Sequence, residues 1–319
     1  MDKRNARYLI IGGAPRAGTT SLYQWLSMHP AVCPSSLKET RFFVDADYPL
    51  PAAHRFDGAN ICQYFRFFSH YSSLKQSLCV EATPDYLYTS TALRIADELP
   101  YSKIIFVLRD PVERMASWFK YAKQRGFLSS ATTFREYLNL QCDLHITPST
   151  PIHLRALDQG RYWKYIPNFE RAFGDRLMLV NFDDLRSDPS SVMAGICDFA
   201  NIDKTHVNPP DLIPNNASYQ SRFPRIEGLY GRIRRRLADS LHDSPGVVRI
   251  LRRPNQLVRA MLNAGKTKAA DTQIDDDLVQ VIYRQTCNYS SPSTNYGNYF
   301  QRPINQASDT CSNSVFVNE

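Results

Sequence analysis

The chain has 319 residues, of which 22% are charged and 43% hydrophobic, and it carries a formal net charge of +7. These values are those of a soluble globular protein with ample material for a core. We expect no transmembrane segment, because no run approaches the roughly 18 apolar residues of a membrane span. The first residues hold only a four-residue apolar run, too short for a signal peptide, which predicts a cytoplasmic location.

The first motif, residues 8–28, reads YLIIGGAPRAGTTSLYQWLSM. Its first four residues have the apolar character of a buried parallel strand, and a glycine pair follows them. Apolar residues then recur at helical spacing until Pro30 stops the helix. A strand, a glycine turn and a helix N-terminus together point backbone N–H groups at a phosphate or sulfate.

This loop departs from the P-loop of nucleoside triphosphatases in its cation. Gly13 and Gly18 keep the G-x-x-x-x-G spacing, but Thr19 and Thr20 follow where a lysine and a hydroxyl residue are expected. The cation of the loop is Arg16 instead. Such a loop suits an anion that needs no metal, and a generic βα turn with glycines for steric reasons is the alternative.

Between this motif and the next, the sequence predicts a loop, two helices and a strand. Residues 31–60 contain several prolines and predict a long irregular loop, and loops of that length are often functional. Residues 61–71 predict an aromatic helix that packs the core. Residues 78–81 predict a short strand, and residues 90–99 predict a helix ended by Pro100.

The second motif, residues 103–124, reads KIIFVLRDPVERMASWFKYAKQ and begins with another apolar strand. An aspartate, a proline and a glutamate then occupy the N-cap, N1 and N3 positions of a helix. Arg109 leaves the strand at its carboxyl end, where α/β sheets bind ligands. Ser117 lies two helical turns further on and faces roughly the same way. We therefore expect Arg109 and Ser117 to form a second phosphate site, separate from the first.

The elements that follow continue the alternation of helices and strands. We expect helices at 134–140, 162–173, 191–200 and 278–286, and a strand at 177–181. The whole pattern predicts an α/β fold, with a P-loop-like central parallel sheet and helices on both faces.

The C-terminal part departs from this pattern. Residues 231–259 are rich in arginine interleaved with apolar residues, which predicts an amphipathic helical pair with a solvated basic face. A membrane or polyanion surface is the alternative. Residues 291–319 predict a polar, flexible tail. We expect one domain over residues 1–290, with an irregular C-terminal extension and no nucleic-acid partner, since zinc-finger and RNP patterns are absent.

Cysteine and histidine spacing predicts no metal site. The chain has seven of each, without a C-x-x-C pair or H-E-x-x-H spacing. Scattered cysteines, odd in number, are typical of reduced thiols in a cytosolic protein.

Two anion sites at the carboxyl edges of two strands resemble those of sulfotransferases that use 3′-phosphoadenosine-5′-phosphosulfate (PAPS). The first loop resembles their 5′-phosphosulfate loop, and Arg109 with Ser117 resembles their 3′-phosphate site. The resemblance implies that PAPS is the co-substrate, that 3′,5′-ADP is the product and that no metal takes part. The loop residues that it implies in donor binding are Arg16, Ala17, Gly18, Thr19 and Thr20.

Further segments are similar to the heparan-sulfate sulfotransferase-like branch of this family. Residues 38–43, KETRFF, resemble its K-E-x-x-F-F segment, whose glutamate is the proposed catalytic base. Residues 80–84, VEATP, resemble its V-E-K-T-P segment, with alanine in place of lysine. Residues 160–189 resemble the G-x-Y…F…D-P stretch that closes the core. The resemblance extends over about residues 5–200.

These segments imply a catalytic pair. Arg16 would hold the bridging oxygen of the donor, although the family more often has lysine there, which leaves proton donation by this residue open. Glu39 would be the general base, worth ~10²–10⁴ in rate. A surface carboxylate is the alternative for Glu39. Glu81 is the next candidate base, although a carboxylate at a strand end often only orients a neighbouring cation.

Five further residues are expected to make contacts in the site. Lys38 and Arg41 are expected to pair with Glu39 or with an anionic acceptor, and Tyr121 to face the acceptor. Lys266 and Lys268 resemble the basic lid over the 3′-phosphate, with a surface loop as the alternative.

Two other classes of protein stay open. The first is a P-loop kinase or NTPase. The missing lysine and the absence of a clear Mg²⁺-binding aspartate count against it. A non-catalytic polyanion-binding module would use the arginine-rich segment. The acceptor is not identified: a saccharide and a small specialised metabolite fit equally well, as hydroxyl or amine.

Overall fold

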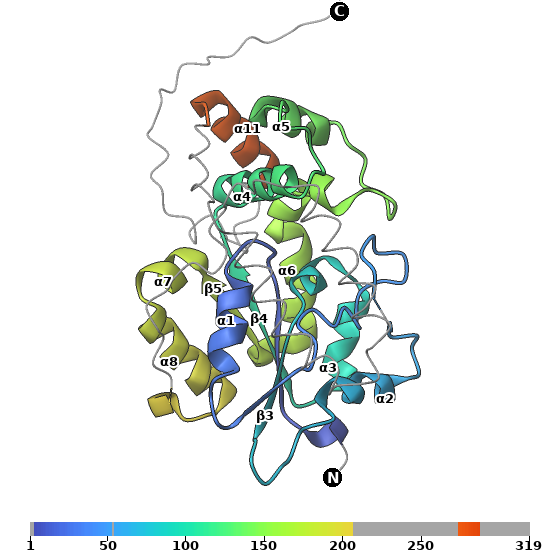
Figure 1. The fold of residues 1–319 in the computed structure, drawn as a ribbon, viewed down its shortest axis with the longest axis vertical. Helices are drawn as coiled ribbons and strands as arrows, with labels where there is room; N and C mark the ends of the chain where they lie inside the picture. The colour runs from blue at the N-terminus through green and yellow to red at the C-terminus, as the bar shows by residue number, and fades with distance from the viewer. Residues whose placement is uncertain (1–2, 53, 207–273, 288–319) are drawn as a thin grey trace, which may run out of the picture.

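A five-stranded, all-parallel sheet forms the centre of the computed structural model, which describes residues 3–52, 54–206 and 274–287 (Figure 1). The strand order is β2-β3-β1-β4-β5. The predicted α/β class with a P-loop-like sheet is therefore confirmed. The strands are β1 (Tyr8–Gly13), β2 (Val32–Pro34), β3 (Leu78–Ala82), β4 (Ser102–Leu108) and β5 (Leu177–Asn181).

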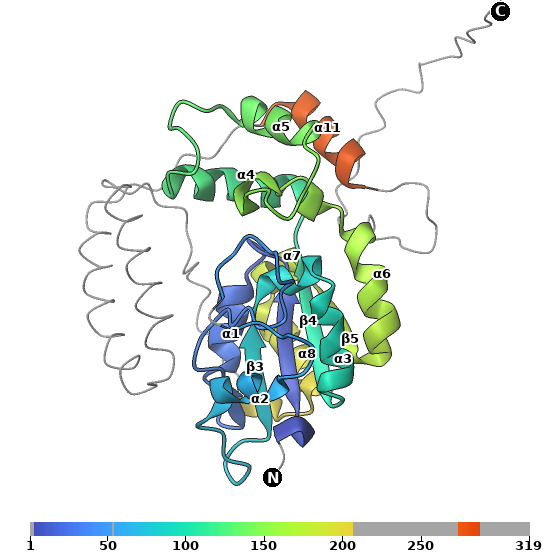
Figure 2. The same cartoon turned by 90° about the vertical axis from the view of Figure 1, so that its right-hand side faces the viewer.

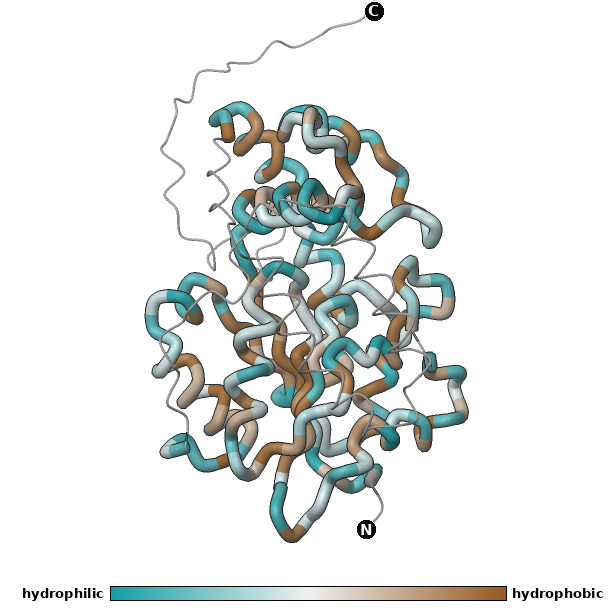
Figure 3. The backbone as a smooth tube through the Cα atoms, in the orientation of Figure 1, coloured by the Kyte–Doolittle hydropathy of each residue, from teal (hydrophilic) through white to brown (hydrophobic). Residues whose placement is uncertain are grey.

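The central strands lie in the hydrophobic core. All six residues of β1 and all five of β3 are buried, and the hydrophobic colour of Figure 3 concentrates on these strands. Parallel strands covered on both faces require such continuous apolar runs. Leu9 pairs with Val80 of β3 and with Lys103 of β4, so β1 lies between the two strands.

Helices cover both faces of the sheet. Figure 2 shows α1 on one side of the strands, and α3 and α6 on the other. Within the described residues, no helix is long and apolar enough to span a bilayer. The helices around the sheet are α1 (Thr19–Leu26), α2 (Ile61–Tyr64), α3 (Ile95–Glu98), α6 (Tyr162–Phe173), α7 (Phe182–Ser187) and α8 (Pro189–Ala200).

Three further helices form a layer beyond the carboxyl edge of the sheet (Figure 2). They are α4 (Pro111–Gln124), α5 (Phe134–Cys142) and α11 (Asp276–Thr286). Their apolar side chains share a second hydrophobic cluster, separate from the sheet core. The Tyr283 hydroxyl of α11 donates to Asp110 Oδ2 at 2.6 Å, and Arg135 of α5 pairs with Asp277 at 2.7 Å. The expected last helix thus packs back onto the domain.

Four local predictions need correction. Residues 32–34 form strand β2 inside the segment expected to be an irregular loop. The helix expected over 61–71 is a single α turn followed by a 3₁₀ helix, Phe65–Phe68, and the helix expected over 90–99 is divided in the same way. Helix α7 was not predicted. All of these elements are short, and periodicity over four to six residues cannot distinguish helix from strand or loop.

Several predictions concern the C-terminal part of the chain. The arginine-rich segment 231–259, the two lid lysines Lys266 and Lys268, and the tail 291–319 lie outside the described residues and stay predictions, as do the domain bounds.

Close packing at the end of β1 requires glycine. A Cβ on Gly13 would lie 2.8 Å from the Cβ of Leu87 and 3.1 Å from the ring of Phe106. We expect Gly13→Ala to destabilise the protein by about 1–3 kcal/mol, because the turn after β3 would have to move. Gly195 of α8 is the matched control, since its nearest atom is Met178 Cε at 3.9 Å.

Gly195→Ala should stabilise the protein by about 0.5–1 kcal/mol, because alanine is the better helix former. Urea unfolding of both variants measures the two effects. Equal stability of the Gly13 and Gly195 variants would contradict the close approach at β1.

Candidate functional site

The turn after β1 presents the start of α1 to an anion. Gly18 is the N-cap residue of α1, with a φ of 82° that favours glycine, and no side chain caps the helix. The first N–H groups of a helix have no partner inside it. Thr19 and Thr20 begin the helix, and Ala17 donates its N–H to the Ala14 carbonyl at 3.2 Å. N–H groups in this position can bind an anion, and the anion-binding role of the loop stays a prediction.

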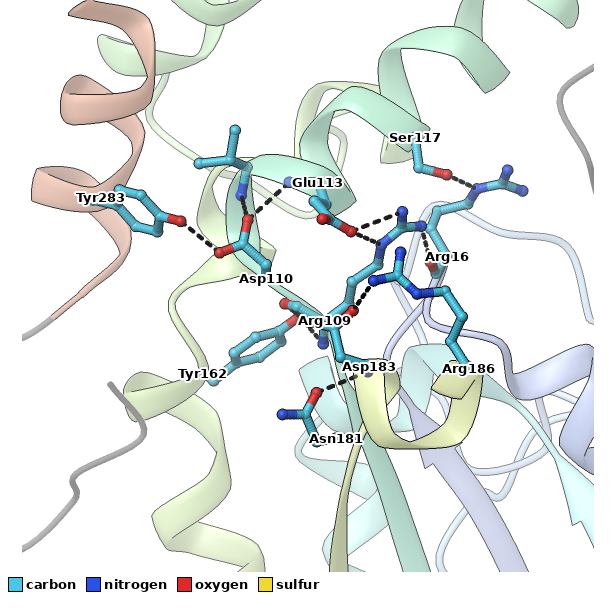
Figure 4. Close-up of polar contacts among 11 residues, drawn as sticks. Arg16, Arg109, Asp110, Glu113, Ser117, Tyr162, Asn181, Asp183, Arg186 and Tyr283 are labelled. Carbon is cyan, nitrogen blue, oxygen red and sulfur yellow. Dashed lines mark hydrogen bonds and ion pairs between the residues drawn. The ribbon is translucent and has the colours of Figure 1, made fainter. Parts of the chain in front are cut away.

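Arg16 links the two predicted anion sites. Its Nε donates to Ser117 Oγ at 3.1 Å, and Nη1 of Arg109 donates to the Arg16 carbonyl at 3.1 Å (Figure 4). The sites were expected to be separate, and the structure instead brings them into direct contact. The reason is the strand order: β1 and β4 are neighbours, so the loops that follow them meet at one edge.

Arg109 is held by groups that the sequence analysis did not assign to the site. Glu113 Oε2 lies 3.2 Å from its Nη2, and the Phe182 ring centroid lies 4.5 Å from its Cζ. The Tyr162 hydroxyl donates to the Arg109 carbonyl at 3.0 Å. Glu113 could have been found from its place one helical turn after the arginine. For Phe182, by contrast, the only indication in the sequence is its position directly after a predicted strand.

The Arg16 guanidinium keeps its charge at neutral pH. Burial lowers its pKa to about 10, the nearby Tyr121 opposes this, and the charges of Arg109 and Arg125 add to it. Its Cζ lies 4.9 Å from the Tyr121 ring centroid, and Arg125 lies over the same ring at 5.2 Å. Tyr121 therefore borders the cationic site, and its contact with an acceptor stays a prediction.

Glu39 is paired with the two cations next to it in the sequence. Lys38 Nζ lies 3.2 Å from Oε1, and Arg41 Nη2 lies 2.8 Å from Oε2. Burial opposes ionisation of Glu39, but the charges of Lys38 and Arg41 outweigh it and lower the pKa to about 2. The Glu39 side chain is 33% exposed, so it remains open to a ligand.

The residues of these two loops share an unusual backbone conformation. Among the described residues, four that are not glycine have a positive φ, and three of them are Arg16, Glu39 and Arg41. Non-glycine residues rarely adopt this region, and those that do cluster at functional sites. The Glu39 N–H donates to the Ala82 carbonyl at 2.9 Å, which fixes the loop to the end of β3.

Glu81 is surrounded by hydroxyl groups. It is fully buried and accepts hydrogen bonds from the hydroxyls of Thr40 at 2.5 Å, Thr83 at 2.6 Å, Tyr64 at 2.7 Å and Tyr86 at 3.0 Å. Burial raises its pKa, and these hydrogen bonds work against that shift. The alternative that Glu81 only orients a neighbouring cation has no support here, because hydroxyls donate to both of its oxygens. It acts as a structural centre beneath the Glu39 loop.

No group of three or more metal-ligating side chains is present in the part of the chain that the structure describes. The candidate site is the carboxyl edge of the sheet, which carries the cations Arg16 and Arg109, with the ion-paired carboxylate of Glu39 beside them. Arg16, Arg109 and the helix N–H groups are of the kind that can bind an anion, and Glu39 lies on the side of β3.

The chain was compared with known proteins in sequence and in fold, and the sequence matches one family. The family model described as "Sulfotransferase domain" matches residues 7–221. The mouse bifunctional heparan sulfate N-deacetylase/N-sulfotransferase 4 is 28% identical over 205 residues, covering 61% of this chain and 22% of its own length. The human bifunctional heparan sulfate N-deacetylase/N-sulfotransferase 3 is 28% identical over 217 residues, covering 62% and 22%. The chain thus spans about a fifth of the length of these relatives.

The fold is similar to that of a sulfotransferase from Alicyclobacillus acidocaldarius. The TM-score is 0.53 and the identity 24%, over 77% of this chain and 99% of that one. This likeness supports the arrangement of sheet and helices.

The family match bears on the classes of protein that the sequence left open. It includes both motifs, the β1 loop and the β4 loop, and extends from residue 7 to residue 221. The predicted class of enzyme is confirmed, and a kinase or NTPase is not favoured. The chain belongs to the sulfotransferase domain family.

Proposed function

We propose that this chain transfers the sulfuryl group of PAPS to a hydroxyl or amine of a saccharide or a small specialised metabolite. The observation that carries the proposal is the junction of Arg16, Ser117 and Arg109 at one sheet edge. Within the described residues, Arg16 forms no ion pair with a carboxylate, although burial lowers its pKa. A buried cation without a counter-charge favours the binding of an anion.

The donor would lie across both loops. The β1 loop and the N-terminus of α1 would hold the 5′-phosphosulfate, through Arg16 and the N–H groups of residues 17–20. Arg109 and Ser117 would hold the 3′-phosphate. The direct contact between the two loops suits a ligand whose two phosphates are joined by one ribose.

The chemistry is an in-line displacement at sulfur. The acceptor oxygen or nitrogen forms a bond to sulfur, the bond from sulfur to the bridging oxygen breaks, and 3′,5′-ADP leaves. Arg16 would stabilise the negative charge that develops on the leaving oxygen. Glu39 would accept the proton that the acceptor loses. Fixed cations and N–H groups replace a metal here, since a sulfuryl group carries less charge than a phosphoryl group.

The acceptor side is defined by the Glu39 loop and α4. Lys38, Arg41 and Tyr121 would contact the acceptor, and their cationic character suits an anionic one. The relatives are named heparan sulfate N-sulfotransferases, that is, enzymes that transfer a sulfuryl group to nitrogen. This supports a saccharide and an amine as the first acceptors to test, with small metabolites alongside.

The location and the metal independence are further proposals. A cytoplasmic location is supported by the scattered cysteine spacing of the sequence, and cell fractionation would test it.

The direct test of function is incubation with PAPS and a panel of saccharides and small hydroxyl and amine compounds. Sulfated product, detected by its mass, is the expected result.

The donor site predicts discrimination between two nucleotides. Arg109→Ala and Ser117→Ala should weaken binding of 3′,5′-ADP by ~1.5–3 kcal/mol each, because each removes a contact to a charged phosphate. Binding of 5′-AMP should change far less, since it lacks the 3′-phosphate. Calorimetry with both nucleotides measures the difference. Equal losses for the two would remove these residues from the 3′-phosphate site.

Activity should not depend on a divalent metal. The β1 loop has no lysine at the position where NTPases place it, and the proposed chemistry uses Arg16 and N–H groups instead. We expect the rate of sulfuryl transfer to survive EDTA unchanged. Loss of activity on chelation, with recovery on added Mg²⁺, would contradict this mechanism.

The general base is tested by Glu39→Gln. The amide keeps the shape of the side chain but cannot take a proton, so kcat should fall by ~10²-fold or more. Affinity for 3′,5′-ADP and the melting temperature should stay near wild type. A folded variant that binds 3′,5′-ADP and turns over at the wild-type rate would place the base elsewhere.

A further inference from the structure

Two tyrosine hydroxyls hold the junction between β4 and α4. Tyr162, the first residue of α6, reaches the backbone of Arg109, and Tyr283 of α11 reaches the side chain of Asp110 (Figure 4). The two tyrosines therefore act on neighbouring residues from two helices far apart in the sequence. Arg109 is the residue expected at the 3′-phosphate, so the groups that fix this junction bear on donor binding.

Tyr162 contacts both backbone polar groups of Arg109. The pairing of β4 with β5 ends at Leu108, so the N–H and the carbonyl of Arg109 lie beyond that ladder. The Tyr162 hydroxyl accepts from this N–H at 3.4 Å and donates to this carbonyl at 3.0 Å. Tyr162 is only 2% exposed, so its hydroxyl is held inside the protein. Because a buried backbone group without a partner costs free energy, these bonds constrain the path of the chain as it leaves β4.

Tyr283 acts on the residue that caps α4. Asp110 is 6% exposed, and its Oδ1 accepts from the N–H groups of Val112 and Glu113, each at 3.0 Å. The Tyr283 hydroxyl donates to the other oxygen, Oδ2, at 2.6 Å. The Glu113 carboxylate in turn pairs with Nη2 of Arg109 at 3.2 Å. Tyr283 is thus connected to the Arg109 guanidinium through the cap of α4.

Helix α11 also supports the residues just before Tyr162. Arg161 donates to the carbonyl and to Oε1 of Gln285, both at 2.9 Å. A Cβ on Gly160 would lie 2.8 Å from Cγ2 of Thr286, so the two segments are in close contact. One helix therefore contacts both sides of the β4–α4 junction. It lies outside residues 7–221, the part of the chain that the family model matches.

We propose that Tyr162 and Tyr283 are positioning residues for binding of the 3′-phosphate, and that α11 thereby belongs to the donor site. The inference rests on the proposed function, in which Arg109 binds this phosphate. Neither hydroxyl contacts the donor. The two hydroxyls hold the backbone from which the Arg109 side chain projects, and a side chain that is already in place loses less conformational freedom when the anion binds.

The proposal predicts a loss of selectivity between two nucleotides. Tyr162→Phe and Tyr283→Phe each remove one hydroxyl and keep the ring. Affinity for 3′,5′-ADP should fall about 3- to 10-fold in each variant, the effect of one hydrogen bond. Affinity for 5′-AMP should stay near wild type, because this nucleotide lacks the phosphate that Arg109 would bind. Calorimetry with both nucleotides measures the two affinities.

Tyr137→Phe is the matched control. Tyr137 of α5 is fully buried, and its hydroxyl donates to the His153 carbonyl at 2.6 Å, away from the β4–α4 junction. Loss of this bond should lower the melting temperature and leave both nucleotide affinities unchanged. The control thus separates a general loss of stability from a loss of positioning. Tyr283 is only half-buried, so its variant measures the effect with the sheet core untouched.

A double-mutant cycle tests the route through Arg109. In the Arg109→Ala background, Tyr162→Phe and Tyr283→Phe should have little further effect on affinity for 3′,5′-ADP, because the side chain that they position is absent. A loss as large as in the wild-type background would show that the hydroxyls act on the donor by another route, which contradicts the proposal.

Other outcomes overturn the inference without touching the proposed function. Equal losses for 3′,5′-ADP and 5′-AMP, or wild-type selectivity in both tyrosine variants, would show that the two hydroxyls have only a structural role. Wild-type selectivity in Tyr283→Phe alone would remove α11 from the donor site. By contrast, a wild-type protein that binds 3′,5′-ADP no more tightly than 5′-AMP and transfers no sulfuryl group contradicts the proposed function itself.

Discussion

The site depends on one constraint of the sheet: β1 and β4 are adjacent parallel strands, so their carboxyl ends meet at one edge. The loop after β1 carries Arg16, and the helix after β4 carries Ser117, 101 residues later in the sequence. Strand pairing brings them within hydrogen-bond distance. Parallel sheets place ligand sites at such edges because every loop after a strand arrives on the same side. The helical layer of α4, α5 and α11 then stands over this edge.

Electrostatic balance differs between the two halves of the site. On the donor side, Glu113 compensates Arg109, whereas Arg16 has no carboxylate partner among the described residues. On the acceptor side, Glu39 is compensated by Lys38 and Arg41. A bound anion would supply the missing negative charge on the donor side. The two halves thus favour ligands of different charge, an anion at Arg16 and a proton-donating group at Glu39.

Strain is concentrated where the chemistry is proposed. Arg16, Glu39 and Arg41 adopt positive φ values of 71°, 63° and 55°. Each such residue costs of order 1 kcal/mol or more, and the surrounding structure must hold it there. Burial of Phe42 and Phe43 and the hydroxyl cage around Glu81 supply that support beneath the Glu39 loop. The rigid core therefore sets the geometry of an otherwise exposed loop.

Local sequence pattern was enough to predict most of the strands and the loops at the site. Apolar runs identified β1, β3, β4 and β5, the Asp110 cap identified the start of α4, and glycine spacing identified the anion loop. The tertiary structure was needed to show that the two anion sites touch, that the Phe182 ring lies over Arg109, and that the Glu39 loop is bonded to the end of β3. These are contacts between segments far apart in the chain, and no local periodicity encodes them. Folding also sets the acidity of these carboxylates: the charges of Lys38 and Arg41 lower the pKa of Glu39, whereas burial raises that of Glu81, although the two side chains are chemically identical.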